Sequence, residues 1–384
     1  MGYLHAEVTI RQSPKRPGHP CGDLVRVDRT AAATTIICAD GIGSGVKANL
    51  AAQMAVSRLG ELIAGGFSFR RAFGRVVAGM EDVRSAAQVY PYAVLSAAQV
   101  LGDGSATTLT YEMPPPLLVG GRSASVVRPR SVPSGRAVIG EATFDLAPGE
   151  GLLMVSDGIT QAGLGNGLSD GWQAEAVARF ITDRLGAGDA ADGIALAVHD
   201  RARQLWSPLA GDDCTVAAAF CREGTVLNIL TGPPSSRQKD AEVAKRFLGG
   251  DGLKVICGAS TAGLVARQLG RSVEVDQDSQ SLIAPPQYVL EGVDLVTEGA
   301  VTLNQVYNVL GEDSARFEEV SGVTQICQLL QVADRVNFIV GLAANPANSS
   351  ITFRQRGIIN RRNIVPLIAQ KLVDKGKLVV VEYV

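Results

Sequence analysis

Short, almost wholly apolar runs separated by glycine-rich turns make up the first part of the chain. The runs Thr34–Ala39 and Gly151–Ser156 contain no charged residue, which predicts strands that are buried on both faces. Ala93–Leu101 is a further predicted strand, followed by a glycine-rich turn. Apolar residues at helical spacing predict a helix over Lys47–Ala64, and a second helix is predicted over Phe69–Gly79 or slightly beyond. Strands around a helix pair therefore dominate this part of the chain.

The pattern changes near residue 222. From there strand and helix patterns alternate, in the order Val226–Thr231, Arg237–Leu248, Lys254–Cys257 and Thr261–Leu269. Such an order favours a parallel sheet whose strands are joined by crossover helices. We therefore predict two domains, residues 1–222 and 223–384. The second is expected to be a separate α/β domain with a parallel sheet and a regulatory or ligand-binding role.

Acidic residues stand where the predicted strands of the first domain begin or end. Asp40 and Asp157 each follow an apolar run directly, and each precedes a glycine. Asp23 begins a predicted strand, and Asp212 and Asp213 form a turn just before the closing strand of the domain. Because the ends of buried strands are rigid, they can hold these carboxylates close together.

Crowded carboxylates repel one another, and they are costly unless a cation neutralises them. Two Mn²⁺ or Mg²⁺ ions about 3.5–4 Å apart would meet that need, and would place a water for in-line attack on a phosphate. Ligands that are all oxygen atoms favour these ions over zinc. The alternative is that each Asp-Gly pair is an ordinary turn. Spacing alone leaves both interpretations open.

Composition narrows the function classes further. The formal charge of −2 and the lack of an apolar run of transmembrane length give no reason to expect a nucleic-acid or membrane partner. The six cysteines form no Cys-x-x-Cys pair, and none has an arginine six residues later. The cysteine-phosphatase motif and a cysteine-rich zinc site are therefore excluded. No apolar signal-peptide core is present, so we expect a cytoplasmic protein with reduced thiols.

Four motifs, in matching order and spacing, carry a family resemblance. They are Gly22-Asp23, the run from Ala39 to Gly45 with its following helix, the run from Ser156 to Ile159, and the run from Asp212 to Thr215. With them, residues 1–222 resemble the PPM (type 2C) metal-dependent Ser/Thr protein phosphatases of the bacterial SpoIIE-type branch. The resemblance implies an α+β fold, in which two antiparallel sheets form an α/β/β/α sandwich. It does not extend to the C-terminal domain.

The resemblance also implies roles for the acidic residues. Asp40 would bridge two metal ions, and Gly41 would offer its backbone carbonyl to the second ion. Asp157 and Asp212 would bind the first ion, so Asp40 and Asp157 are the expected catalytic residues. Since the chain lacks the arginine that many eukaryotic relatives use for phosphate, metals and backbone would have to bind the phosphate.

Two further positions of the acidic set are less defined by the resemblance. Asp23 would hold metal-bound water or the second metal ion. Asp213 fills the second position of the family's D-[DN]-x-[ST] motif, and its role as a metal ligand stays open. The expected metal-binding residues are therefore Asp23, Asp40, Gly41, Asp157, Asp212 and Asp213.

The implied substrate is phosphoserine or phosphothreonine on a partner protein, such as an anti-sigma-factor antagonist. In similar proteins the helix pair after Gly45 is the place of control, so its packing is expected to decide whether the metal site is assembled. The rival hypothesis is a catalytically weak or silent binding regulator with the same fold. Its C-terminal domain would sense a small anionic ligand. The oligomeric state stays open.

Two strand-to-helix turns of the second domain are candidate sites for such an anion. Leu230–Ser236 and Cys257–Thr261 place small residues at helix N-termini, where free N–H groups can bind an anion. The alternative is that their serine and threonine residues simply cap those helices. Neither turn contains a dinucleotide or P-loop motif.

Overall fold

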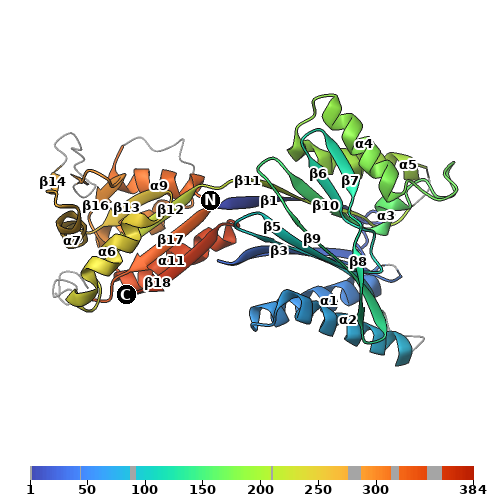
Figure 1. Cartoon of the computed structure of the whole chain (residues 1–384), viewed down its shortest axis with the longest axis horizontal. Coiled ribbons are helices and arrows are strands. Elements are labelled where there is room, and N and C mark those ends of the chain that lie inside the picture. The colour runs from blue at the N-terminus through green and yellow to red at the C-terminus, as the bar shows by residue number, and fades with distance from the viewer. Residues whose placement is uncertain are drawn as a thin grey trace. The chain divides into compact units, whose positions relative to one another are not determined.

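The computed structural model of the chain describes residues 2–43, 45–86, 92–208, 211–275, 287–312, 320–343 and 357–384. Ser44, part of the predicted glycine-rich motif, lies outside the described residues. The chain divides into two compact units, Tyr3–Glu223 and Gly224–Val384. In Figure 1 the first unit runs from blue to yellow-green and the second from yellow to red.

Two antiparallel sheets form the centre of the first unit. The six-stranded sheet has the order β2 (Asp23–Arg29), β3 (Ala33–Gly41), β4 (Ala93–Leu101), β5 (Ser105–Tyr111), β9 (Ala137–Asp145) and β8 (Arg130–Ser134). The five-stranded sheet has the order β1 (Leu4–Ser13), β11 (Cys214–Glu223), β10 (Gly151–Val155), β6 (Leu117–Gly120) and β7 (Ser123–Val126). Every pair of neighbouring strands in both sheets is antiparallel.

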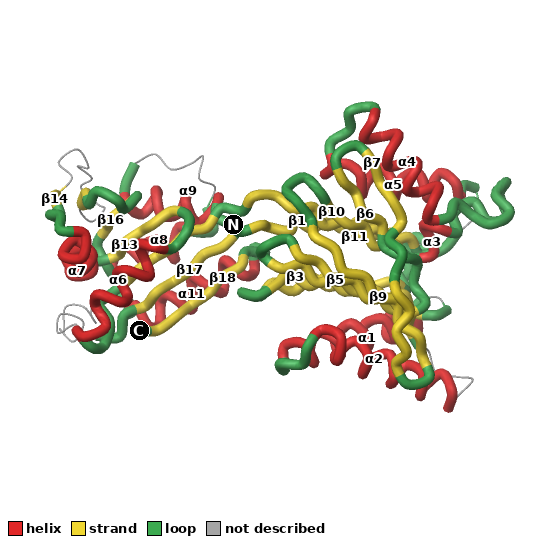
Figure 2. The backbone as a smooth tube through the Cα atoms, in the orientation of Figure 1, coloured by secondary structure: helices red, strands yellow, loops and turns green. Residues whose placement is uncertain are grey.

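Helices cover the outer face of each sheet. The six-stranded sheet packs against α1 (Val46–Ala64) and α2 (Phe69–Ala86). The five-stranded sheet packs against α3 (Asp157–Thr160), α4 (Ala174–Gly186) and α5 (Ile194–Trp206), and a short 3₁₀ turn (Ala191–Gly193) precedes α5. Figure 2 shows the strands of this unit lying between the helices of its two sides. The predicted α/β/β/α sandwich is confirmed.

Strand β3 shows why an uninterrupted apolar run is needed in this architecture. Its side chains alternate between two cores, because successive residues of a strand point to opposite faces. Ile37 and Ala39 pack against the helix layer, whereas Ile36 and Cys38 lie between the two sheets. All four are at most 3% exposed. The strand therefore reaches Asp40, the residue before its last, with both of its faces buried.

The second unit is built on one mixed sheet of seven strands. Their order is β14 (Glu274–Val275), β15 (Gln287–Val289), β16 (Leu295–Thr297), β13 (Leu253–Cys257), β12 (Val226–Thr231), β17 (Arg335–Val340) and β18 (Leu378–Tyr383). The five strands from β16 to β18 are parallel, as predicted, while β15 and β14 add an antiparallel edge. Numbered along the chain, the parallel strands have the order 3-2-1-4-5.

Helices cover both faces of this sheet. On one face lie α6 (Asp240–Gly249), which follows a 3₁₀ turn (Arg237–Lys239), and α7 (Ala259–Leu269). On the other lie α8 (Ala300–Val309), α9 (Gly322–Val332) and α11 (Arg361–Asp374). Of the helices that the structure describes, none combines the length and the apolar character that crossing a bilayer requires.

Candidate active site

Asp23 and Asp40 face each other across two neighbouring strands. They are partners in the antiparallel register of β2 and β3, where like charges directly opposite one another are unfavourable. Asp23 is only 2% exposed, and neither of its carboxylate oxygens has a hydrogen-bond partner among the described residues. A buried carboxylate without a partner is costly. This pair therefore holds negative charge that the described residues do not compensate.

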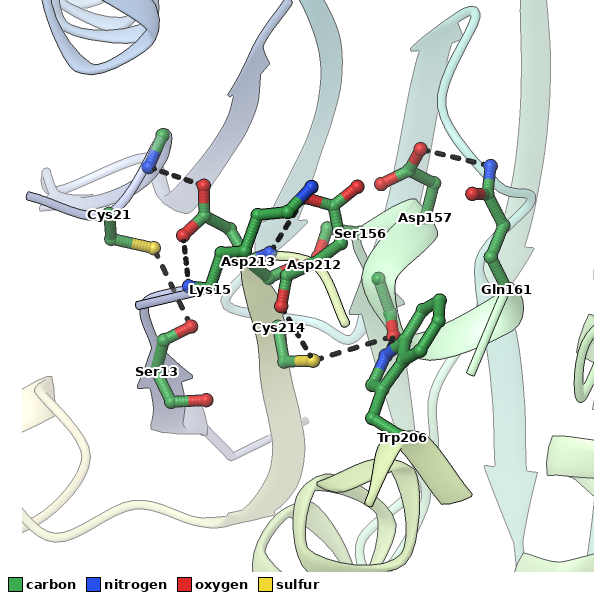
Figure 3. Close-up of polar contacts among 12 residues, drawn as sticks. Ser13, Lys15, Cys21, Ser156, Asp157, Gln161, Trp206, Asp212, Asp213 and Cys214 are labelled. Carbon is green, nitrogen blue, oxygen red and sulfur yellow. Dashed lines mark hydrogen bonds and ion pairs between the residues drawn. The ribbon is translucent and has the colours of Figure 1, made fainter. Parts of the chain in front are cut away.

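Asp157 joins the pair from the other sheet, although not from a strand end as predicted. Strand β10 stops at Val155, and Asp157 is the first residue of the short helix α3. Its carboxyl group lies close enough to that of Asp40 for its charge to act on Asp40. Its Oδ2 atom also accepts a hydrogen bond of 3.0 Å from the side chain of Gln161, one helical turn later (Figure 3).

Burial, and after it the charges of neighbouring carboxylates, shifts the pKa values of these carboxyl groups upward. The pKa of Asp40 is raised to about 9, first by burial and then by the charges of Asp23 and Asp157. Burial raises the pKa of Asp23 to about 7, although the nearby hydroxyls of Thr215 and Ser156 lower it in part. Neither hydroxyl hydrogen-bonds with Asp23 at normal geometry. Burial, followed by the charge of Asp212, also raises the pKa of Asp157.

Asp212 and Asp213 are neighbours in the sequence, but their carboxylates make different contacts. Asp213 is buried, and its Oδ1 and Oδ2 atoms accept backbone N–H hydrogen bonds from Lys15 (2.7 Å) and Gly22 (2.9 Å). Asp212 is half-buried, and its Oδ1 atom lies 3.5 Å from the ammonium group of Lys15. Figure 3 shows Lys15 between the two carboxylates. Asp213 thus ties the loop before Asp23 to the start of β11.

Gly41 is packed too tightly for any side chain. A Cβ atom at this position would lie 1.9 Å from the carbonyl oxygen of Ala48 on α1. Its N–H group donates a 3.2 Å hydrogen bond to the carbonyl of Gly22. Only glycine can therefore follow Asp40 while β3 and α1 stay in contact.

The acidic residues fit hard divalent cations in chemical type. Within the described residues, no three His, Cys, Asp or Glu side chains form a ready metal-ligand group. Yet the donors are all oxygen atoms, which Mn²⁺ and Mg²⁺ prefer, and a bound cation would compensate the buried carboxylate of Asp23. Mutual repulsion between carboxylates favours a more open arrangement until a cation is bound.

The structure brings most of the sequence-predicted residues into one region. The charges of Asp23, Asp157 and Asp212 all act on Asp40, and Asp213 acts on Asp23. Sequence reasoning missed Lys15 and Gln161. Gln161 stands four residues after Asp157, the spacing of one helical face, but the helix between them is too short for its period to show in the sequence. Nothing in the sequence around Lys15 marks it.

Comparison with known proteins decides the family. The profile of the Stage II sporulation protein E (SpoIIE) family matches residues 30–221, half of the chain. The chain belongs to the SpoIIE family. The matched region is the PPM phosphatase domain of that family, and the match does not include the C-terminal unit. A search of curated proteins finds no match.

Solved structures with a similar fold include two bacterial relatives of low identity. The RsbU and RsbW domains of Rv1364c from Mycobacterium tuberculosis are 18% identical, with a TM-score of 0.49, over 64% of this chain and 68% of that one. The PP2C phosphatase domain of SpoIIE from Bacillus subtilis, solved with a fragment of its regulatory domain, is also 18% identical, with a TM-score of 0.49. That match covers 59% of this chain and 66%, just under two thirds, of the other.

In the C-terminal unit of this SpoIIE-family chain, an arginine lies where β12 and β17 end. The Nε–H group of Arg361 donates to the carbonyl of Gly341 (2.7 Å), and a further N–H donates to Ala343. A Cβ atom on Gly232 would lie 2.4 Å from the guanidinium carbon. Burial, and then the charge of Arg362, lower the pKa of Arg361. No carboxylate of the described residues pairs with it.

Proposed function

We propose that the chain is a Mn²⁺- or Mg²⁺-dependent protein phosphatase that hydrolyses phosphoserine and phosphothreonine on a partner protein. The observation that carries the proposal is the facing pair of Asp23 and Asp40, with its buried carboxylate that lacks a partner. Membership of the SpoIIE family supports it. An anti-sigma-factor antagonist is the proposed substrate, and the cytoplasm, which the six free thiols favour, is the proposed setting.

The proposed ligands of two ions are the predicted ones except Asp213. Asp40 would be shared, Asp157 and Asp212 would complete one side, and Asp23 with the carbonyl of Gly41 would complete the other. The chemistry that such ions supply when bound is the activation of water for in-line attack on a phosphate.

The chain's own residues hold this arrangement in place. Gln161 orients Asp157 through their 3.0 Å hydrogen bond. Asp213 is proposed as a positioning residue and not as a ligand, since both of its oxygens already accept backbone N–H groups. The ammonium group of Lys15 lies close enough to Asp212 to balance part of its charge.

The proposal is tested by a phosphatase assay with p-nitrophenyl phosphate and a phosphoserine peptide in Mn²⁺. Asp40→Asn and Asp157→Asn should each lower kcat/KM at least about 100-fold, because removing a charged ligand removes transition-state stabilisation. Asp82→Asn, which changes an exposed carboxylate on α2, is the matched control. Equal activity in all four proteins would refute the metal mechanism.

The same assay separates the enzyme from the silent regulator. A regulator with this fold would bind the phosphopeptide without hydrolysing it. Asp40→Asn replaces a buried carboxyl group, crowded by Asp23 and Asp157, with an amide that cannot become charged, so the metal-free variant should melt no lower than the wild type. Loss of activity in a well-folded variant is then a loss of chemistry.

For the C-terminal unit we propose a regulatory site for a small anion. The order 3-2-1-4-5 reverses direction between β12 and β17, and open α/β sheets bind ligands at the carboxyl ends of the strands at such a point. Arg361 lies there with no carboxylate partner among the described residues. Phosphate or ATP should raise the melting temperature of the full chain, and Arg361→Gln should abolish the shift. Lys245→Gln, an exposed site on α6, should retain it.

A further inference from the structure

A pocket lies beside Asp212 that the proposed chemistry does not use. Its volume is about 170 Å³. Its lining includes Ser13, Lys15, Arg203, Trp206, Pro208 and Asp212. These residues come from the end of β1, the loop after it, the end of α5 and the turn before β11.

The walls of the pocket are tied to the acidic centre. The indole N–H of Trp206 donates a 2.8 Å hydrogen bond to the carbonyl of Gly158, the residue after Asp157. The thiol of Cys214 donates to the same carbonyl at 3.4 Å, and both contacts are drawn in Figure 3. On the other wall, the hydroxyl of Ser13 lies 3.0 Å from the imidazole of His199 on α5. The pocket is therefore held at a fixed place relative to Asp157.

Its charge is opposite to that of the centre. Arg203 is exposed, and no carboxylate of the described residues pairs with it. Lys15 pairs with Asp212 at 3.5 Å, and the proposed function also gives that carboxylate to a metal ion. A bound cation would therefore neutralise part of the negative charge beside Lys15, and the pocket would present two positive groups.

We propose that this pocket binds the side chain next to the phosphorylated residue of the substrate, and that it selects a carboxylate. The inference rests on the proposed phosphatase function, because a phosphoresidue at the acidic centre would bring its neighbour beside Asp212. Arg203 and Lys15 pair with the carboxylate. The indole of Trp206 and the ring of Pro208 pack against its methylene groups, as apolar walls around a few polar groups do in binding sites generally. The volume admits one acidic side chain.

The test uses phosphoserine peptides that differ at one flanking position, which is glutamate, alanine or lysine, scanned over two residues on each side. In the wild-type chain with Mn²⁺, kcat/KM should favour glutamate over lysine about 1.4- to fivefold at one position, the range for exposed charge pairs. Arg203→Glu should reverse that ratio. p-Nitrophenyl phosphate, which has no flanking residue, reports the chemistry of each variant separately.

The matched control is Arg201→Glu, on the same helix but outside the lining, where the side chain contacts Gln204. It should keep the wild-type ratio. An unchanged ratio in Arg203→Glu, or an equal change in Arg201→Glu, would overturn the pocket assignment.

Binding gives a readout that does not depend on turnover. Acid-flanked phosphopeptide should change the fluorescence of Trp206 in the Asp157→Asn variant, and should bind more tightly than the lysine-flanked peptide. Trp206→Phe should remove the signal. If no substrate is hydrolysed, the phosphatase proposal fails, and the pocket is still judged by this binding preference. If hydrolysis occurs with no flanking preference in turnover or binding, the pocket proposal alone fails.

Discussion

Among single residues, Asp23 indicates most clearly that the site takes up a proton or a cation. A carboxylate that is 2% exposed and has no hydrogen-bond partner is kept in few folds without a function. Its strand neighbours cannot relieve it, since the residue opposite is Asp40. The favourable solutions are to protonate the group or to bind a cation. Protonation and metal binding should therefore compete at this position.

That competition predicts a pH dependence for the metal-free protein. The pKa values of Asp23 and Asp40 rise from 3.8 to about 7 and about 9, so the folded chain binds more protons than the unfolded chain over this range. The free energy of unfolding then falls as pH rises. In a chelating buffer, the melting temperature of the first unit should fall between pH 5 and pH 9. Mn²⁺ should restore it most strongly at the high end.

Two variants check the source of this effect. Asp23→Asn should flatten the fall between pH 5 and pH 7 and weaken the stabilisation by Mn²⁺. Asp82→Asn should leave both unchanged. A melting temperature that is constant or rises with pH in the chelating buffer would contradict the assignment.

At the scale of elements, the contact between β3 and α1 joins the acidic motif to the helix pair. Gly41 stands at the end of β3 and touches the backbone of Ala48 on α1, with no room for a methyl group. Any displacement of α1 would be transmitted to Asp40 through one peptide unit. We expect packing of the helix pair to act on the proposed metal site by this route, as the family resemblance implies.

A methyl group at this contact should disturb stability and activity together. Gly41→Ala would place a Cβ atom 1.9 Å from the carbonyl oxygen of Ala48, and such overpacking costs about 1–3 kcal/mol. Thermal unfolding and Mn²⁺-dependent hydrolysis of p-nitrophenyl phosphate should both show the loss. Gly79→Ala, at an exposed position of α2 with nothing within 4 Å, should instead stabilise by about 0.5–1 kcal/mol. Equal effects of the two changes would argue against the contact.

Sequence patterns predicted those strands and helices that a short stretch of sequence is enough to determine. β4 and β12 have the predicted bounds, because each is a short apolar run between turns. Helix α11 was not predicted, since Pro366 lies inside it and proline usually ends a helical pattern. Helix α3 was also missed, because four residues are too few to show a period. These two segments lack a clear helical pattern in the sequence, and tertiary packing holds them as helices instead.

At the scale of the molecule, the acidic residues can be predicted from the sequence, but the residues that position them cannot. Asp213 binds the N–H groups of Lys15 and Gly22, which are 198 and 191 residues away. Such contacts depend on which strands are neighbours, and no periodicity encodes that. For the same reason, the strand order of the second unit cannot be predicted from local sequence patterns. The resemblance predicted the first unit's sandwich, whereas nothing comparable existed for the second.

Each hydrophobic cluster of the described residues draws its members from one unit. Three clusters belong to the first unit and two to the second. We therefore expect residues 224–384 alone to unfold cooperatively in calorimetry, within a few degrees of one transition of the full chain. A segment from residue 232, which lacks the central strand β12, is the control and should not fold, because β13 and β17 both pair with β12. A disordered 224–384 segment would show that this unit depends on the first for its stability.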